Sequence, residues 1–355
     1  IMPSKARKAA AQASYQQGEN KNALCNGDFA VAQRGTTLES GSNADTDYTL
    51  DRWKLFSDTD NVVDVAQITS GVPTGNKYAL DLDVETANKK FGIAQIVENI
   101  NCQNLIGNTV TLSFKAKVNA TTNMDNVKAA IIAWSSTADA PTDDMISAWG
   151  VEGTNPTLES NFTYENTPAN LNVTTSWADY SVTAAIDTSS TANIIVFIWS
   201  DVTTTTAGTD HLYLGNVQLE LGNTATDFQY EGYAKNLIRC QRYYEVIKMQ
   251  SYARVGNSLN TNDTRGHAFD FKVEKRTSSL TLGHSTIGRS SGEFTFTNSL
   301  GNYVSTDPDD IGAYLTTSNA SIYATSSTNI AGLTNDSISC IYVNGTAELN
   351  FDAEL

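Results

Sequence analysis

Beyond residue 18 the chain consists mostly of short β-rich runs, and some of them alternate hydrophobic and polar residues with a period of two. Residues 78–84 and 110–118 show this most clearly, and each predicts a strand with one buried and one solvated face. Turn clusters such as residues 73–76 separate the apolar runs. Four more β-rich runs follow, at residues 128–134, 177–185, 192–199 and 211–221. Together they predict about nine strands before residue 233, arranged as an antiparallel sandwich or jelly roll.

Two segments depart from this alternation. Residues 1–20 contain helix formers after Ser4 but almost no large apolar side chain, so they predict a helical arm that is stable only when docked. Residues 234–250 predict a linking helix, because apolar residues recur there at steps of three and four. These residues are Leu237, Cys240 or Gln241, Tyr244 and Ile247.

Strand patterns return after residue 251, at residues 268–273, 279–282, 293–297, 320–324 and 337–343. The sequence therefore predicts an all-β fold class with two helical segments. Its expected parts are a helical N-terminal arm (1–20), a jelly-roll β-sandwich (21–233), the linking helix (234–250) and a smaller C-terminal β-sandwich (251–355).

The charge is strongly negative and unevenly distributed. Residues 21–233 hold 10 basic and 26 acidic residues, which equals the net charge of −16 for the whole chain. Binding to nucleic acid requires clustered Lys and Arg, so no nucleic-acid partner is expected. The two predicted helical segments are basic, which suggests that they dock while the acidic body stays soluble and separate.

The sequence shows no pattern typical of a transmembrane helix, a secretory signal or a disulfide framework. The longest apolar run, residues 194–199, is far shorter than the roughly 20 residues of a spanning helix, so no membrane insertion is expected. Residues 1–8 are basic but no apolar stretch follows, unlike a secretory signal. The four cysteines are widely spaced, and most are expected to be buried small apolar residues: Cys25, Cys102, Cys240 and Cys340.

Catalytic patterns point to no enzyme. The three histidines, His211, His267 and His284, are scattered and are read as surface or half-buried strand residues rather than metal ligands. No G-x-S-x-G nucleophile motif occurs. Acidic pairs such as Asp143 and Asp144 lie in turn-like contexts, where solvated carboxylates are more common than catalytic ones. We therefore expect no catalytic residue, no metal and no cofactor.

The five tryptophans are the residues best suited to stacking on sugar rings. Trp53 and Trp199 lie in apolar strands and are expected in the core, which is also favoured for Trp134 and Trp177. Trp149 follows Ala148 in the loop-rich stretch 141–168, read as long loops at one rim, and is the best exposed candidate. The expected glycan patch comprises Trp149, Tyr164, Asp143 and Asp144.

Several short motifs carry a resemblance. They are Asn26-Gly27-Asp28-Phe29, Gln33-Arg34-Gly35, residues 48–53, residues 217–222, Ala225-Thr226-Asp227-Phe228 with Tyr230, residues 240–244 and Ala353-Glu354-Leu355. In this order and spacing they resemble bacteriophage tail-fibre and virion-surface proteins whose first domain is similar to jelly-roll carbohydrate-binding modules. The resemblance spans most of residues 22–355 and leaves the arm uncovered.

This resemblance implies a non-enzymatic virion component, usually a homotrimer, that projects from the particle and contacts a host surface glycan or protein. The arm would bind other virion proteins. Family modules often hold a structural calcium ion, but Leu214-Gly215-Asn216 stands where they commonly have aspartates. A non-adhesive capsid or tail decoration protein and a glycan-degrading tailspike or stand-alone adhesin remain alternatives.

The predicted helix has two interpretations. It is either a connector packed on its own domains or a seam at a threefold axis, with Leu237, Tyr244 and Ile247 facing their copies. Both can hold together.

Overall fold

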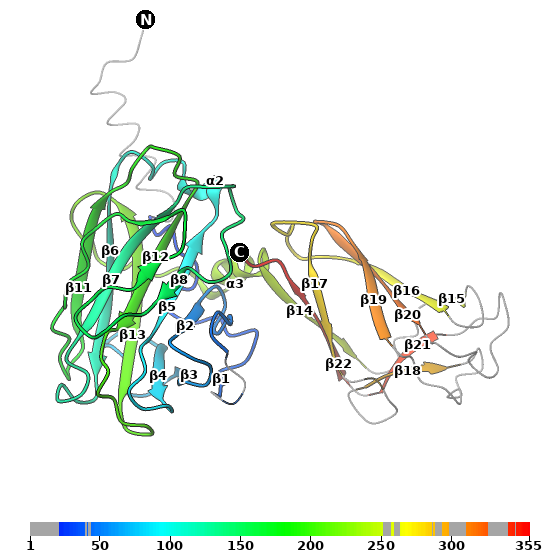
Figure 1. Ribbon diagram of the computed structural model, residues 1–355. Helices are drawn as coiled ribbons and strands as arrows, with labels where there is room; N and C mark the ends of the chain where they lie inside the picture. Colours follow the sequence, from blue (N-terminus) through cyan, green and yellow to red (C-terminus); the bar gives the residue numbers. More distant parts are fainter. Residues whose placement is uncertain are drawn as a thin grey trace, which may run out of the picture. The chain divides into compact units, whose positions relative to one another are not determined.

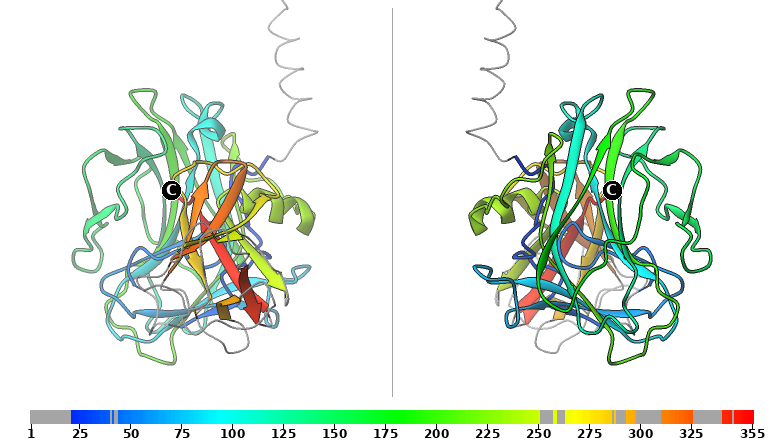
Figure 2. Two further views of the ribbon diagram at one scale, coloured as in Figure 1. Left: turned by 90° about the vertical axis from the view of Figure 1, so that its right-hand side faces the viewer. Right: turned by 90° about the vertical axis from the view of Figure 1, so that its left-hand side faces the viewer.

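The computed structural model describes residues 21–39, 41, 44–250, 257–258, 263–285, 287, 293–297, 310–325, 340–344 and 346–355. The chain forms two compact units, the first comprising Ile1–Asn236 with Leu355 and the second Leu237–Glu354 (Figures 1 and 2). The predicted N-terminal arm, residues 1–20, lies outside the described residues.

The first unit is a β-sandwich of two antiparallel sheets (Figure 1). Sheet A has the order β1 (Thr37–Leu38), β3 (Val63–Ile68), β4 (Ala79–Val84), β13 (His211–Leu221), β6 (Thr109–Val118), β11 (Ala178–Ala185). Sheet B has the order β10 (Phe162–Tyr164), β7 (Val127–Trp134), β12 (Asn193–Ser200), β5 (Phe91–Val97), β2 (Lys54–Ser57). The expected all-β, jelly-roll-like sandwich is confirmed, and the clear alternations at residues 78–84 and 110–118 are β4 and β6.

The main core lies between the sheets and follows from the period of two. Along β6, Leu112 and Phe114 point inward and are buried, while Ser113 and Lys115, which alternate with them, face outward. Each fully buried Leu or Phe contributes roughly 1.5–3 kcal/mol of hydrophobic stabilisation. Trp53 is fully buried in this core, as predicted.

Sheet B is buried on both faces, because its outer side carries a second apolar cluster. Every residue of β7 and β12 is buried, and the ring of Phe197 stacks on that of Trp199 at 4.7 Å on the outer side. Residues 135–164, with β8 (Ile146–Ala148) and β9 (Thr157–Leu158), fold over this face. The interpretation of this stretch as rim loops was therefore wrong.

A buried charge network fastens this covering segment to sheet B. The Asp201 carboxylate lies 2.5 Å from the Lys90 ammonium and 2.7 Å from the Lys128 ammonium. Its Oδ2 accepts a hydrogen bond from the Gly153 amide at 2.9 Å, and Lys90 also donates to the Val151 carbonyl. All three charged side chains are at most 5% exposed. The segment is thus attached by ionic contacts as well as by apolar packing.

The second unit contains short antiparallel strands. Their bounds are β14 (Tyr244–Gln250), β15 (Asn257–Ser258), β16 (Asp263–Asp270), β17 (Thr281–His284), β18 (Glu293–Thr297), β19 (Asp310–Leu315), β20 (Asn319–Thr325), β21 (Cys340–Asn344) and β22 (Thr346–Asp352). They pair as β14-β22-β17, β15-β16-β20-β19 and β18-β21. The described parts surround an apolar cluster that includes Phe294, Leu349 and Phe351. Whether these strands form the expected C-terminal sandwich stays a prediction.

The linking helix predicted over residues 234–250 was wrong beyond its first half. Helix α3 spans Tyr233–Gln241, and Tyr244–Gln250 is strand β14, whose Ile247 pairs with Leu349 of β22. The local spacing fits either structure. The hydrogen-bonding edge of β22, more than 90 residues later in the chain, selects the strand.

Two smaller predictions concern cysteines and membranes. Cys25, Cys102 and Cys240 are buried, as expected, whereas the side chain of Cys340 lies outside the described residues. Another shorter helix, α2 (Asn99–Cys102), follows β5. In the described part of the chain, neither helix has the length and apolar character needed to traverse a bilayer.

Candidate functional site

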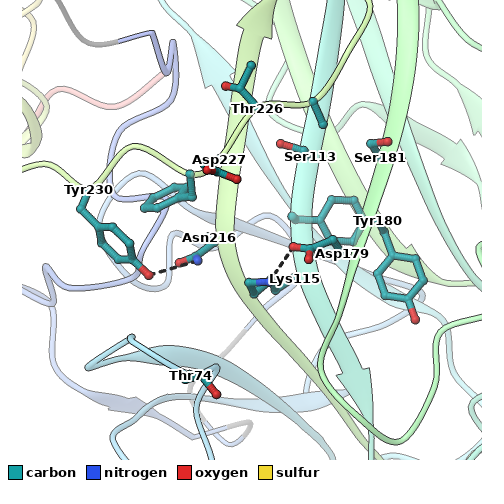
Figure 3. Close-up of a pocket in the computed structure, with 13 residues that line it drawn as sticks. Thr74, Ser113, Lys115, Asp179, Tyr180, Ser181, Asn216, Thr226, Asp227 and Tyr230 are labelled. Atoms are coloured by element: carbon teal, nitrogen blue, oxygen red, sulfur yellow. Dashed lines mark hydrogen bonds and ion pairs between the residues drawn. The ribbon is translucent and has the colours of Figure 1, made fainter.

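The outer face of sheet A bears a polar groove near its β11 edge (Figure 3). Antiparallel register places Ser113 of β6 opposite Ser181 of β11, and Lys115 opposite Asp179. The Lys115 ammonium lies 2.7 Å from the Asp179 carboxylate. These four outward side chains form the floor of a hollow of about 370 Å³, a volume within the range typical of ligand sites.

One wall of this groove is residues 225–230, which follow β13. Buried Glu220 holds the wall: its carboxylate accepts hydrogen bonds from the Thr226 amide at 2.8 Å and the Thr226 hydroxyl at 2.7 Å. Buried Gln218 accepts another from the Gln229 amide at 3.0 Å. Two buried side chains on the outer face of β13 therefore position the wall, which contributes Asp227 and Tyr230 to the groove (Figure 3). Phe228 lines the groove from the same wall.

The end of the groove is formed where β13 is irregular. The register between β13 and β6 shifts between Gly215 and Gln218, and Asn216 has a φ of 53°. A Cβ at position 215 would lie 3.2 Å from the Cγ of Pro73, so glycine allows the β3–β4 loop to approach the strand. The bulge turns the Asn216 side chain to meet Asn76 of this loop, with a hydrogen bond of 2.6 Å.

The groove presents polar groups that other residues do not use. Within the part of the chain that the structure describes, the hydroxyls of Ser113 and Ser181 and the Asp227 carboxylate make no hydrogen bond or ion pair. The wall adds the aromatic rings of Phe228 and Tyr230, whose centroids lie 5.0 Å apart. Donors, acceptors and aromatic surface therefore meet in one concavity, the combination that suits a polyhydroxylated ligand.

An aromatic row lies next to the groove on the same face. The rings of Trp177 and Tyr213 are 6.4 Å apart, and the Lys117 ammonium lies 5.3 Å and 4.5 Å from their respective centroids. Trp177 donates a hydrogen bond of 2.8 Å from its indole N–H to the Gly71 carbonyl. The β3–β4 loop thus runs between this row and the groove, because it also contacts Gly215 and Asn216.

The end of the row toward the N-terminus of β13 is acidic. The hydrogen bond that the His211 imidazole donates to the Asp81 carboxylate raises the pKa of His211 above its ordinary value of 6.5 and outweighs the opposite effect of burial. Burial, with smaller contributions from Asp81 and Asp83, raises the pKa of Tyr213 to about 12. His211 is therefore a half-buried strand residue, as predicted, and the Tyr213 ring stays neutral at physiological pH.

The expected glycan patch is not an open patch. Trp149 is only 9% exposed and packs on Phe197 at 6.1 Å, so the prediction of an exposed indole was wrong. The apolar outer face of sheet B is the physical reason, because burying it requires a cover of large side chains. Half-buried Tyr164 packs against the same cluster and donates to the Pro156 carbonyl at 2.9 Å.

The two acidic residues of that patch have local partners. Asp143 lies 2.5 Å from the buried Lys54 ammonium and accepts from the Thr46 hydroxyl at 2.8 Å. Burial by itself would raise the pKa of Asp143, but these two contacts outweigh it and hold the pKa below the ordinary value. Asp144 accepts from the Ile146 amide at 2.8 Å, as a turn residue does. Burial raises the pKa of nearby Asp45 to about 6, and the Asp144 charge adds to the rise.

The predicted oligomer seam does not exist as one helical stripe. Leu237 lies on α3, whereas Tyr244 and Ile247 lie on β14. Tyr244 is 8% exposed, and Ile247 packs against the apolar cluster of its own unit. The seam formed by these three residues was therefore wrong, although the oligomeric state itself is not decided by it.

Sequence reasoning missed most of the groove. The segments 217–222 and 225–230 were noticed only as motifs of a closing strand, and a core position was favoured for Trp177. A usable signal was present in the alternation of β6 and β11, which marks Ser113, Lys115, Asp179 and Ser181 as one outward face. Across the described ranges, no cluster of three or more His, Cys, Asp or Glu residues is arranged to hold a metal ion.

Comparisons with known proteins yield weak similarity. No family model matches the sequence, and no curated protein matches it. The enzymatically active domain of tailspike protein 4 from bacteriophage CBA120 is 15% identical, with a TM-score of 0.35 over 57% of this chain and 22% of that chain. The chain therefore spans less than a quarter of that structure.

Two further solved structures are similar over 57% of this chain and 100% of their own lengths. A putative sugar-binding protein from Bacteroides thetaiotaomicron is 14% identical, with a TM-score of 0.36. TmCBM61, solved in complex with β-1,4-galactotriose, is 14% identical, with a TM-score of 0.32. A function for this chain therefore has to be inferred from the groove itself.

Proposed function

We propose that the first unit binds a carbohydrate, without cleaving it, in the groove on the outer face of sheet A. The observation that carries this proposal is the meeting of Ser113, Ser181 and Asp227, which lack protein partners among the described residues, with the rings of Phe228 and Tyr230. Sugar hydroxyls need paired donors and acceptors, and the apolar C–H face of a pyranose packs against aromatic surface.

The experiment tests binding by a variant in which a large side chain fills the groove. The purified full chain would be applied to an array of bacterial surface glycans, alongside the variant Ser181→Trp, whose indole would occupy the space above the floor. The matched control is Ala185→Trp, since Ala185 is exposed on the same face of the same strand and does not line the hollow. We expect the wild type and Ala185→Trp to bind the same glycan, and Ser181→Trp to lose at least about tenfold in affinity.

Two results would overturn the proposal. One is equal binding by Ser181→Trp and the wild type, and the other is the absence of binding to every surface glycan tested. If the protein releases reducing ends from a bound polysaccharide, the proposal that it binds without cleaving is contradicted, whereas the proposal that it binds carbohydrate is not. Thermal unfolding of each variant establishes that a loss of binding is not a loss of folding.

At the level of the whole protein, the proposed role is a homotrimeric tail fibre or spike on a virion. Support comes from the motif resemblance over residues 22–355 and from the basic segment 1–20, which would bind other virion proteins beside an acidic body. Three copies of a weak site would raise avidity at a host surface without tight single-site binding.

Light scattering and electron microscopy test this role. A mass of three chains in solution and antibody labelling at the distal end of the tail of an intact particle are the expected results. A monomer would contradict the trimer. Burial of the protein in a capsid or tail shell, with no glycan binding, would favour the alternative of a non-adhesive decoration protein.

A further inference from the structure

A second hollow of about 390 Å³ adjoins the groove, and Tyr230 lines both. The second hollow contains the rings of Tyr78, Tyr230 and Tyr233. Tyr230 and Tyr233 are 56% and 57% exposed, which places them among the most exposed large side chains described. One aromatic ring therefore separates two concavities of similar size within the first unit.

Tyr230 is held upright between the hollows by its hydroxyl. That hydroxyl donates to the Asn76 side-chain oxygen. It also accepts from the Asn216 side-chain amide at 3.2 Å (Figure 3). Asn216 sits at the β-bulge of β13, and Asn76 belongs to the β3–β4 loop. Segments far apart in the chain thus fix the orientation of an exposed ring, which reduces the entropy lost when a ligand packs on it.

We infer that the two hollows form one extended site for a chain of neutral sugar units that crosses the Tyr230 ring. This inference rests on the proposed function and specifies its ligand. Hollows of 370 and 390 Å³ would each accept sugar units, and the ring between them would support the unit that joins them. The affinity should therefore depend on chain length.

The charges of the site argue for a neutral chain. Four carboxylates line the two hollows, from Asp28, Asp179, Asp227 and Glu231, against the two ammonium groups of Lys77 and Lys115. Asp179 already neutralises Lys115 at 2.7 Å. Residues 21–233 carry 26 acidic and 10 basic residues, so the surrounding field also repels a polyanion.

Calorimetric titration of the full chain tests both parts of the inference, the extension of the site across Tyr230 and its preference for a neutral ligand. The probes are neutral gluco-, galacto-, manno- and xylo-oligosaccharides from disaccharides to octasaccharides, with oligo-uronic acids of matched length. For the neutral series that binds, we expect the octasaccharide to bind at least about tenfold more tightly than the disaccharide or trisaccharide. We expect Tyr230→Ala to abolish this gain, so that the octasaccharide binds no more tightly than the disaccharide or trisaccharide. Matched uronic acids should bind at least about tenfold more weakly.

Two further variants separate the ring from its anchoring. Tyr230→Phe keeps the ring and loses the bonds to Asn76 and Asn216, so it should keep most of the length gain. Tyr314→Ala removes a tyrosine that is 61% exposed in the second unit and should change nothing.

Three outcomes would overturn the inference: a length gain that survives in Tyr230→Ala, no length gain in the wild type, or uronic acids that bind as tightly as neutral chains. If one of these outcomes occurs and the wild type still binds a glycan that Ser181→Trp does not, the proposed function stands while this inference falls. If the wild type binds no glycan, both fall.

Discussion

The imidazole Nδ1 of His211 lies 2.9 Å from the carboxylate Oδ1 of Asp81. The two residues project from neighbouring strands, β13 and β4, on the outer face of sheet A. Asp83, Asp64, Asp210 and Glu85 surround the pair, and the His211 ring stacks on Tyr213 at 5.4 Å. A protonated imidazole therefore reduces repulsion among several carboxylates.

The first prediction concerns pH. Because the pKa of His211 is raised above 6.5 in the folded state, its contribution to the free energy of unfolding is complete below about pH 6.5 and is lost as pH rises through the folded pKa. Urea unfolding of the wild type and His211→Gln should therefore differ more at about pH 5.5 than at about pH 8.5. An NMR titration that places the His211 pKa at or below 6.5 would contradict this assignment.

The second prediction concerns the charge pair buried in the second unit. The Lys275 ammonium lies 2.5 Å from the Glu245 carboxylate, and both side chains are fully buried. Lys275→Met would leave a buried carboxylate without its main partner and should lower the free energy of unfolding by about 3–5 kcal/mol. Lys248→Met removes an exposed pair with Glu348 and should cost about 0–1 kcal/mol. If denaturant titrations give similar losses in the free energy of unfolding for Lys275→Met and Lys248→Met, burial does not decide how much each ion pair contributes.

The third prediction concerns the segment that covers sheet B. Asp201→Asn would leave Lys90 and Lys128 buried without their shared carboxylate and weaken the bond to the Gly153 amide. We expect a loss of about 3–5 kcal/mol in the free energy of unfolding. Hydrogen exchange at the Gly153 amide should also accelerate.

The control for this network is Asp58→Asn. Asp58 pairs with Lys89 at 3.3 Å, and both side chains are about one third exposed. This change should cost no more than about 1 kcal/mol and leave the Gly153 amide unchanged. Unaltered Gly153 exchange in Asp201→Asn would refute the role of the carboxylate in fastening the segment.

The fourth prediction concerns the different effects of replacing Trp149 and Trp177. Trp149→Ala opens a cavity in the cluster on sheet B and should cost about 3–5 kcal/mol, without changing glycan affinity below the unfolding temperature. Trp177→Ala removes a half-buried ring on sheet A and should cost less. Thermal unfolding and glycan titration of both variants check this. Selective loss of glycan binding in folded Trp149→Ala would restore the original assignment of that residue.

The reason for the misplaced tryptophan is instructive. Neither Trp149 nor Trp177 belongs to a long apolar run. What separates them is the strand face that each meets: Phe197 and Trp199 for Trp149, and Lys117 and Tyr213 for Trp177. Those partners lie 36 to 60 residues away, so the local pattern carries no information about them.

The sequence by itself determined alternating strands such as β4 and β6, because a period of two is a local property that the backbone geometry of a strand imposes. It also determined the acidity of the first unit and the outward position of Ser113, Lys115, Asp179 and Ser181.

Only the tertiary structure decided where α3 gives way to β14, since the edge of β22 had to be in place. The groove likewise needed the β-bulge at Asn216, the β3–β4 loop and residues 225–230 together. These contacts join residues up to about 150 positions apart, and only packing brings them together.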